Sequence, residues 1–322
     1  MEDRDCTSIE SPRLAPSPSR TAASDCSAAC PIGSRSVCAI IVTYHPTSDM
    51  IGNFSKVLGQ SQGLVVVDNG SSTEAVTALM AGREELGYDL ILNDNNLGIA
   101  VALNQGIQLA KEEGYSWVFL FDQDSGITED LIKRMFAAWE THSHRDLLGA
   151  IHPRYVHPVS GIEPKVVRAR DGGPVTSLTS GSLMPIWIFD KVGWFASEYF
   201  IDQVDTEFDY RIRSFGFLIA DAQDAILQHS AGRPQTCEFL GFNFSPTHHS
   251  PMRRYYMSRN RVAVWRRYFF TFPMWVLRSM IQSLRETIKC FIAEEDRRRK
   301  FRNFVVGTWD GLTGKMGKRE DI

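Results

Sequence analysis

The sequence predicts an α/β fold in which helices cover both faces of a Rossmann-like, mixed and mostly parallel sheet. Short apolar runs alternate with stretches of helical spacing through the first half of the chain. These runs are VCAIIVT from Val37, LVVVDN near residue 64, LILND near residue 90 and WVFLFDQD near residue 117. Runs of this kind are typical of buried parallel strands, and their alternation with helices indicates a doubly wound sheet.

Helical spacing between these runs predicts helices at 50–60, 73–86 and 97–113, with Ser72 and Asn95-Asn96 near their starts. After about residue 150 the pattern loosens into Pro- and Gly-rich loops. A strand at TSLTSGSLMP, a helix near VDTEFDYRIRSFG and two strands, FLIADA and AILQHS, are predicted next. Helical periodicity returns in RRYYMSRNRVAVWRRY and from Met274 to Ile292.

The composition, 43% hydrophobic and 23% charged over 322 residues, is that of a globular protein. The predicted organisation is a disordered tail at 1–36, an α/β domain at 37–250 and a basic, aromatic-rich helical extension at 251–322. The tail lacks the apolar block of a signal peptide, and the chain holds no run of about 18 apolar residues. We therefore expect a cytoplasmic protein with reduced cysteines.

In doubly wound sheets ligands bind beyond the carboxyl ends of the strands, where Thr43, Asp68 and Asn93 also lie. Asp122 and Asp124 flank Gln123 in the turn after the fourth apolar run. Carboxylates of this kind bind Mg²⁺ or Mn²⁺ together with diphosphate oxygens and water. The alternative is a turn with two solvated aspartates.

Two further segments have a binding and a structural interpretation each. Asp68 enters a turn of small residues, where a base or ribose can approach the backbone, and the alternative is a simple helix cap. Gly98 allows close backbone approach at a helix start, with Asn104 and Gly106 on the following turns. Helix–sheet packing is the alternative for this second segment.

FIDQVDTEFDYR supplies acidic residues at a predicted helix start. Asp205 and Asp209 share one face of that helix, and Glu207 points elsewhere. A carboxylate there can act as general base, and a solvated acidic face is the alternative. His229, after the run AILQ, is either a ligand of a metal or diphosphate or a structural histidine.

Taken in order, VTYHP, VDNGSS, NLGIAVALNQG, FLFDQDS, TSGSLMP and FIDQVDTEF resemble family 2 glycosyltransferases of the GT-A fold. The resemblance covers about residues 37–235. MRRYYMSRN and WDGLTGK extend it toward the C-terminus and resemble rhamnosyltransferases that use dTDP-L-rhamnose, those of rhamnolipid synthesis most of all.

The resemblance implies a role for each matched residue. Asp124 and His229 would bind Mg²⁺ or Mn²⁺, and Asp205 would be the catalytic base of an inverting enzyme, although Val204 replaces the glutamate that often precedes it. The acceptor side would include Gly181, Ser182 and Glu207. The donor side would include Thr43, Asp68, Asn96, Gly98, Asn104 and Asp122.

The expected reaction moves L-rhamnose from dTDP-L-rhamnose to an amphiphilic or lipid-linked acceptor in a single displacement. A mono-rhamnolipid giving a di-rhamnolipid is favoured, with O-antigen or other surface polysaccharide synthesis as the alternative. Two competing hypotheses are a haloacid-dehalogenase-type phosphatase with Asp122 as nucleophile and a non-catalytic nucleotide-sugar binder. Such phosphatases usually carry this motif near the start of the domain, whereas three strand–helix units precede it here.

Residues 251–302 carry fourteen Lys and Arg against four Asp and Glu. A basic, aromatic surface of this kind predicts peripheral contact with an anionic membrane on its cytoplasmic face. Trp265, Phe269, Phe270 and Trp275 would then point toward the acyl region. The alternative is a basic face packed on the catalytic domain or on another subunit. No nucleic-acid partner is expected.

Overall fold

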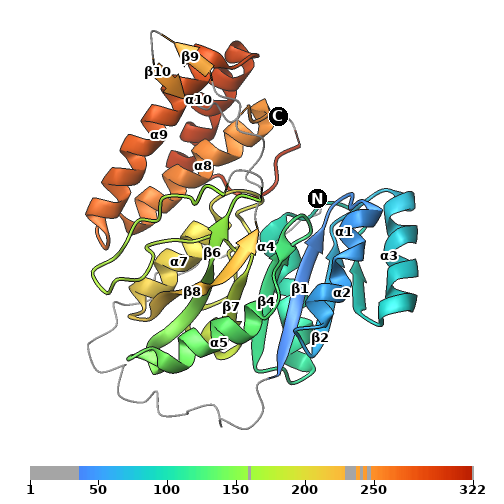
Figure 1. The fold of residues 1–322 in the computed structure, drawn as a ribbon. Coiled ribbons are helices and arrows are strands. Elements are labelled where there is room, and N and C mark those ends of the chain that lie inside the picture. The colour runs from blue at the N-terminus through green and yellow to red at the C-terminus, as the bar shows by residue number, and fades with distance from the viewer. Residues whose placement is uncertain (1–35, 159–160, 229–236, 240–241, 245–247, 321–322) are drawn as a thin grey trace, which may run out of the picture.

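The computed structural model describes residues 36–158, 161–228, 237–239, 242–244 and 248–320 (Figure 1). The predicted tail at 1–36 falls almost wholly outside them. The main sheet has eight strands in the order β3-β2-β1-β4-β7-β6-β8-β5. Its strands are β1 (Val37–Thr43), β2 (Gly63–Asp68), β3 (Asp89–Leu92), β4 (Trp117–Asp122), β5 (Gly126–Ile127), β6 (Leu148–Val156), β7 (Ser182–Pro185) and β8 (Leu218–Gln228).

Helices follow the strands through the first part of the chain, and three longer helices come after them. They are α1 (Ser48–Gly52), α2 (Phe54–Leu58), α3 (Thr73–Leu86), α4 (Ile99–Glu112), α5 (Leu131–Thr141), α6 (Trp187–Val192), α7 (Val204–Ser214), α8 (Pro251–Tyr268), α9 (Pro273–Ala293) and α10 (Arg297–Thr313). A 3-10 turn spans Arg145–Leu147, and a hairpin joins β9 (Cys237–Phe239) to β10 (Phe242–Phe244).

The predicted mixed, mostly parallel sheet is confirmed. β1 pairs in parallel with β2 and β4, β2 pairs in parallel with β3, and β7 runs antiparallel to β4 and β6. Residues on β1 alternate between two cores, because successive side chains of a strand point to opposite faces. Cys38 and Ile40 join the core under α4, α6 and α7, whereas Ala39 and Ile41 join the core under α2, α3 and α5.

Two details of the prediction are wrong in the second half of the sheet. FLIADA and AILQ form one strand, β8, because the three residues after Ala222 bulge out while the pairing with β6 resumes at Ile226. The segment predicted as a loop after residue 150 begins with strand β6. Pro153 obscures this strand in the sequence, and it lies at the register shift, where a missing backbone donor is tolerated.

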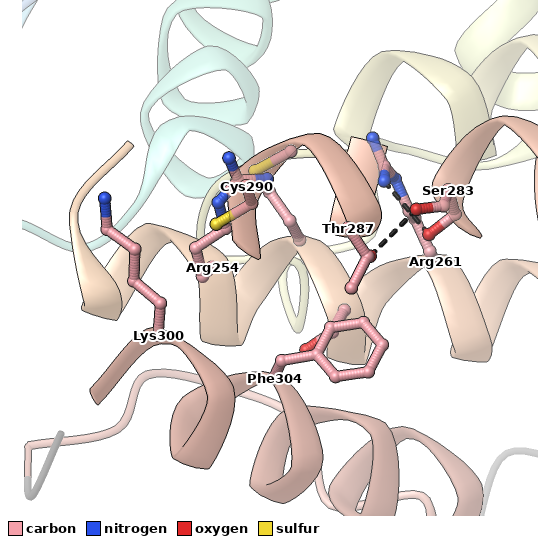
Figure 2. Close-up of a pocket in the computed structure, with 9 residues that line it drawn as sticks. Arg254, Arg261, Ser283, Thr287, Cys290, Lys300 and Phe304 are labelled. Carbon is pink, nitrogen blue, oxygen red and sulfur yellow. Dashed lines mark hydrogen bonds between the residues drawn. The ribbon is translucent and has the colours of Figure 1, made fainter. Parts of the chain in front are cut away.

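The helices α8, α9 and α10 gather beyond one end of the sheet (Figure 1). Figure 2 shows side chains from all three helices around a cavity of about 20 Å³, which is a packing gap. Glu294 holds the helices together here, because it accepts from Arg254 at 2.7 Å and from Lys300 at 2.9 Å. Two basic side chains of this region, Arg254 and Lys300, are therefore paired internally. Among the described residues, every helix is too short or too polar to cross a lipid bilayer.

Candidate active site

The turn Asp122-Gln123-Asp124 lies where the strand order of the sheet reverses. The chain runs outward from β1 through β2 and β3, then returns to form β4 on the other side of β1. A crevice at such a switch point is the usual ligand site of an open α/β sheet. The Gln123 amide spans it, because it accepts from the Tyr44 N–H at 2.9 Å and donates to the Tyr44 carbonyl at 3.2 Å. Gln123 thus fixes the turn against the end of β1.

Three carboxylates from two elements share one electrostatic environment at this crevice. Burial, together with the nearby charges of Asp124 and Asp205, raises the pKa of Asp122 to about 7. Asp124 is exposed in the turn. The described residues contain no group of three His, Cys, Asp or Glu side chains placed to hold a metal alone. Two mutually repelling aspartates do fit a divalent cation whose remaining ligands come from a diphosphate and water.

Asp205 lies in the first turn of α7, in a position that α8 fixes. Asp202 and Gln203 both adopt left-handed backbone, with φ of 65°, and so turn the chain into the helix. Asn260 of α8 donates to the carbonyls of Ile201 and Asp202, each at 2.8 Å. The Asn260 side chain is fully buried, so it belongs to the framework that positions Asp205.

The Asp205 carboxylate is partly buried and receives a local hydrogen bond. Its Oδ1 accepts from the Thr206 N–H at 2.7 Å. Burial raises the pKa of Asp205 to about 6, the Thr206 hydrogen bond works against this rise, and the Asp202 charge adds to it. A carboxylate that titrates near neutral pH, next to the switch point, is suited to general base catalysis.

The predicted donor residue Asp68 organises its own turn. Its carboxylate is fully buried and accepts from the Thr43 hydroxyl at 3.1 Å and from the Ser71 N–H at 2.9 Å, and the Ser71 hydroxyl also donates to it. Thr43 is buried too, so it orients Asp68 instead of facing the crevice. Gly70 at φ of 84° lets this turn pass Asn95, whose backbone lies 2.5 Å from where a Cβ would be.

Three other predicted donor residues fasten α4 to the segment before α7. Asn96 Oδ1 accepts from the Gly98 N–H at 2.9 Å and from the Asn69 amide at 3.1 Å. A Cβ at Gly98 would lie 2.6 Å from the Phe200 carbonyl oxygen, which already accepts from the Ile99 N–H. Asn104 bonds both backbone groups of Phe195. The geometry at Gly98 and Asn104 therefore supports the packing alternative.

The three predicted acceptor-side residues do not face the crevice. Gly181 packs against Pro153 and Leu227, and its N–H donates to the Leu120 carbonyl at 2.6 Å. Ser182 is fully buried, and its hydroxyl lies 2.8 Å from His152 Nδ1. Both residues are short because the sheet is crowded there, so the prediction of an acceptor role is corrected.

Glu207 is buried on the opposite side of α7 from Asp205, as the helical spacing indicates. Its carboxylate accepts from Arg211 at 2.7 Å and from the Tyr268 hydroxyl at 2.9 Å, and Arg267 lies 3.2 Å away. Glu207 thus joins α7 to α8, and this geometry favours a structural role over the predicted contact with the acceptor. His229, the other predicted metal ligand, lies outside the described residues.

Comparison with known proteins identifies the class to which this site belongs. Residues 38–174 match the family model described as glycosyl transferase family 2. This match shows a family 2 glycosyltransferase domain within residues 38–174, and the sheet has the topology of the GT-A fold. The phosphatase alternative is therefore set aside.

One relative with an assigned donor matches nearly the whole chain. The dTDP-rhamnosyl transferase RfbF from Shigella flexneri is 27% identical over 291 residues, which cover 87% of this chain and 96% of the relative.

Two solved structures share the fold at low sequence identity. The mannosyltransferase PcManGT from Pyrobaculum calidifontis, in complex with GDP-Man and Mn²⁺, has a TM-score of 0.53 and 14% identity, covering 87% of each chain. TarS 1–349 from S. aureus has a TM-score of 0.51 and 12% identity, covering 87% of this chain and 72% of that one.

Proposed function

We propose that this protein is an inverting glycosyltransferase that transfers L-rhamnose from dTDP-L-rhamnose. The observation that carries the proposal is the grouping of Asp122, Asp124 and Asp205 at the switch point of the sheet. The likeness to the Shigella dTDP-rhamnosyl transferase supports the rhamnosyl donor. A binding module has no need of Asp205, which supplies a proton acceptor beside the candidate metal site.

In the proposed reaction, Asp205 takes the proton from an acceptor hydroxyl. The hydroxyl oxygen then forms a bond to the anomeric carbon as the bond from that carbon to the dTDP oxygen breaks, which inverts the configuration. Asp124 would hold Mg²⁺ or Mn²⁺, with Asp122 toward the sugar or ribose. When bound, the metal would neutralise charge on the departing diphosphate. The turn that contains Asp68 would form one side of the site for the nucleotide base of the donor.

The proposal predicts donor selectivity that depends on a divalent metal. Incubation with dTDP-L-rhamnose, UDP-GlcNAc or GDP-mannose should release nucleotide from the first donor alone. EDTA should abolish this release, and Mn²⁺ or Mg²⁺ should restore it, because the carboxylates of Asp122 and Asp124 repel the anionic diphosphate unless a divalent cation lies between them. Coupled assay of the released nucleotide measures the effect, and activity that survives EDTA would refute the metal requirement.

The transfer rate should depend on pH through Asp205. A base must be ionised to accept a proton, so kcat/KM is expected to fall as pH drops below about 6 and to level off above it. Below this pKa the rate should fall about tenfold per pH unit, as for a single titrating group. Initial rates in buffers of constant ionic strength measure the profile. A flat profile across this range would contradict the assignment of Asp205.

The acceptor is proposed to be an amphiphilic or lipid-linked saccharide. Mono-rhamnolipid and a precursor of O-antigen or other surface polysaccharide remain the two candidates, because the likeness to the Shigella protein bears on the donor. Product analysis by mass spectrometry with each acceptor separates them.

The membrane surface that we propose differs from the one predicted by the sequence. Trp265 bonds to Ser279, and Trp275 stacks on Phe272, so both indoles pack inward, whereas Phe270 is 92% exposed. Five exposed apolar residues of α9 recur every three or four positions and form what we call the α9 stripe. Its members are Met274, Leu277, Ile281, Leu284 and Ile288.

Exposed Arg285 and Lys289 lie on the same helix as the α9 stripe, and this combination is typical of helices that lie on anionic bilayers. Leu284→Glu should weaken binding to vesicles of phosphatidylglycerol about tenfold or more, because it removes a large apolar side chain from the contact. Met80→Glu, at an exposed site on α3, is the matched control. If both variants float equally well with vesicles, α9 is not the part of the protein that contacts the membrane.

A further inference from the structure

A cavity of about 170 Å³ lies beside α7 and is lined by residues that are close to the proposed catalytic base in the chain. Gln203 and Thr206, on either side of Asp205 in the chain, line one side of it. The Thr206 hydroxyl also donates to the Asp205 carboxylate at 3.3 Å, so a side chain that lines the cavity contacts the base. The opposite wall comes from α8 and α9, where Trp275 and Arg278 contribute.

The wall formed by α9 is held rigidly. The Trp275 ring stacks on Phe272 at a centroid distance of 4.4 Å, and the Arg213 guanidinium lies 5.8 Å from the centre of the same ring. Arg261, which also lines the cavity, donates to Glu286 at 2.6 Å and to Ser283 at 3.1 Å. These contacts fix the shape of the cavity and neutralise the Arg261 charge.

Arg278 differs from Arg261, because no ion pair or hydrogen bond joins it to any other described residue. The Arg213 guanidinium near the cavity is likewise compensated, by Asp171 at 2.6 Å. Arg278, whose side chain is exposed, is therefore an uncompensated cation in the wall of a cavity that Gln203 and Thr206, close to Asp205 in the chain, also line. A guanidinium in this setting binds carboxylates and phosphates through paired, charge-assisted hydrogen bonds.

We infer that this cavity is the acceptor site and that Arg278 binds an anionic group of an amphiphilic saccharide. The inference rests on the proposed function and names the class of acceptor. A sugar unit in the cavity would place a hydroxyl at Asp205 and a carboxylate or diphosphate at Arg278. Both proposed acceptors carry such a group, so the shared chemistry is the negative charge. Gly181, Ser182 and Glu207 are buried and cannot serve this purpose.

Direct binding tests the inference separately from turnover. Calorimetry with the full chain, dTDP and Mn²⁺ would use two matched pairs of probes below their micellar concentrations. One pair is mono-rhamnolipid and its methyl ester, and the other is an alkyl diphosphoryl N-acetylglucosamine and the uncharged alkyl N-acetylglucosaminide. In one of the two pairs, the Kd of the charged probe should be at least about tenfold lower than that of its neutral partner. A preference in the first pair identifies the bound anion as a carboxylate, and a preference in the second pair identifies it as a diphosphate.

Arg278→Ala should remove that preference, Arg278→Lys should keep part of it, and neither should change dTDP affinity. Arg83→Ala is the matched control, because Arg83 is exposed on α3 and lies outside both the cavity and α9. The inference would be overturned if charged and neutral probes bound equally in both pairs, or if none of the four probes bound. Equal effects of Arg278→Ala and Arg83→Ala would overturn it as well. Charge-dependent binding without any sugar transfer would refute the proposed function and leave the acceptor cavity standing.

Discussion

Replacement of Asp205 by asparagine is expected to lower the rate of sugar transfer by about a hundredfold or more, the usual contribution of a general base. Asparagine has the same shape, and its carbonyl oxygen can still accept from the Thr206 N–H. It cannot take a proton from an acceptor hydroxyl. The loss should therefore appear in kcat, with donor affinity and melting temperature close to those of the unchanged protein.

Single-turnover transfer, measured beside calorimetric binding of dTDP-rhamnose and Mn²⁺, separates the chemical step from donor binding. Asp205→Asn should retain both affinities. Transfer by this variant within about tenfold of the original rate would contradict the assignment of the base. A combined loss of donor binding and transfer would place Asp205 in the donor site instead.

In contrast to Asp205→Asn, Glu207→Gln is expected to cause a large loss of stability. Glu207 is fully buried and faces two guanidinium groups and the Tyr268 hydroxyl. Removing its charge leaves the Arg211 guanidinium, whose side chain is only 10% exposed, without its counterion. Breaking a buried ion pair from one side typically costs about 3 kcal/mol or more. Chemical denaturation should show this loss in the free energy of unfolding.

Glu85→Gln on α3 is the control for Glu207→Gln, because Glu85 is exposed and surface substitutions typically change stability by about 0.5 kcal/mol or less. Equal unfolding free energies for the two variants would show that the contact between α7 and α8 contributes little. Below the unfolding transition, Glu207→Gln should still transfer sugar, since its carboxylate faces away from Asp205. The two acidic residues of one motif thus have separable roles.

The first half of the sheet could be predicted from the sequence because its signals are local. VCAIIVT, LVVVDN and WVFLFDQD are unbroken apolar runs that end in polar residues, so both the strands and their carboxyl ends are visible. Strand β6 was missed because Pro153 and the polar residues around it resemble a loop. The spacing of Asp205 and Glu207 also indicated that they lie on different faces of one helix.

Residues whose partners are distant in sequence could not be predicted. Gln123 bonds the backbone of Tyr44, 79 positions away, and Asn260 holds the loop before Asp205 from 58 positions away. No sequence pattern around Gln123 or Asn260 indicates these hydrogen bonds. Gly98 shows why its two interpretations stayed open, because a glycine that admits Phe200 has the same sequence signature as one that admits a phosphate.

The stereochemistry of transfer tests the central claim most directly. Proton NMR of a reaction containing dTDP-L-rhamnose, Mn²⁺ and a mono-rhamnolipid or a lipid-diphosphate saccharide should show a new rhamnosyl linkage with inverted anomeric configuration, and phosphorus NMR should show matching release of dTDP. Asp205→Asn should form neither product. Retention of configuration, or release of inorganic phosphate in place of dTDP, would contradict direct displacement by an acceptor hydroxyl activated at Asp205.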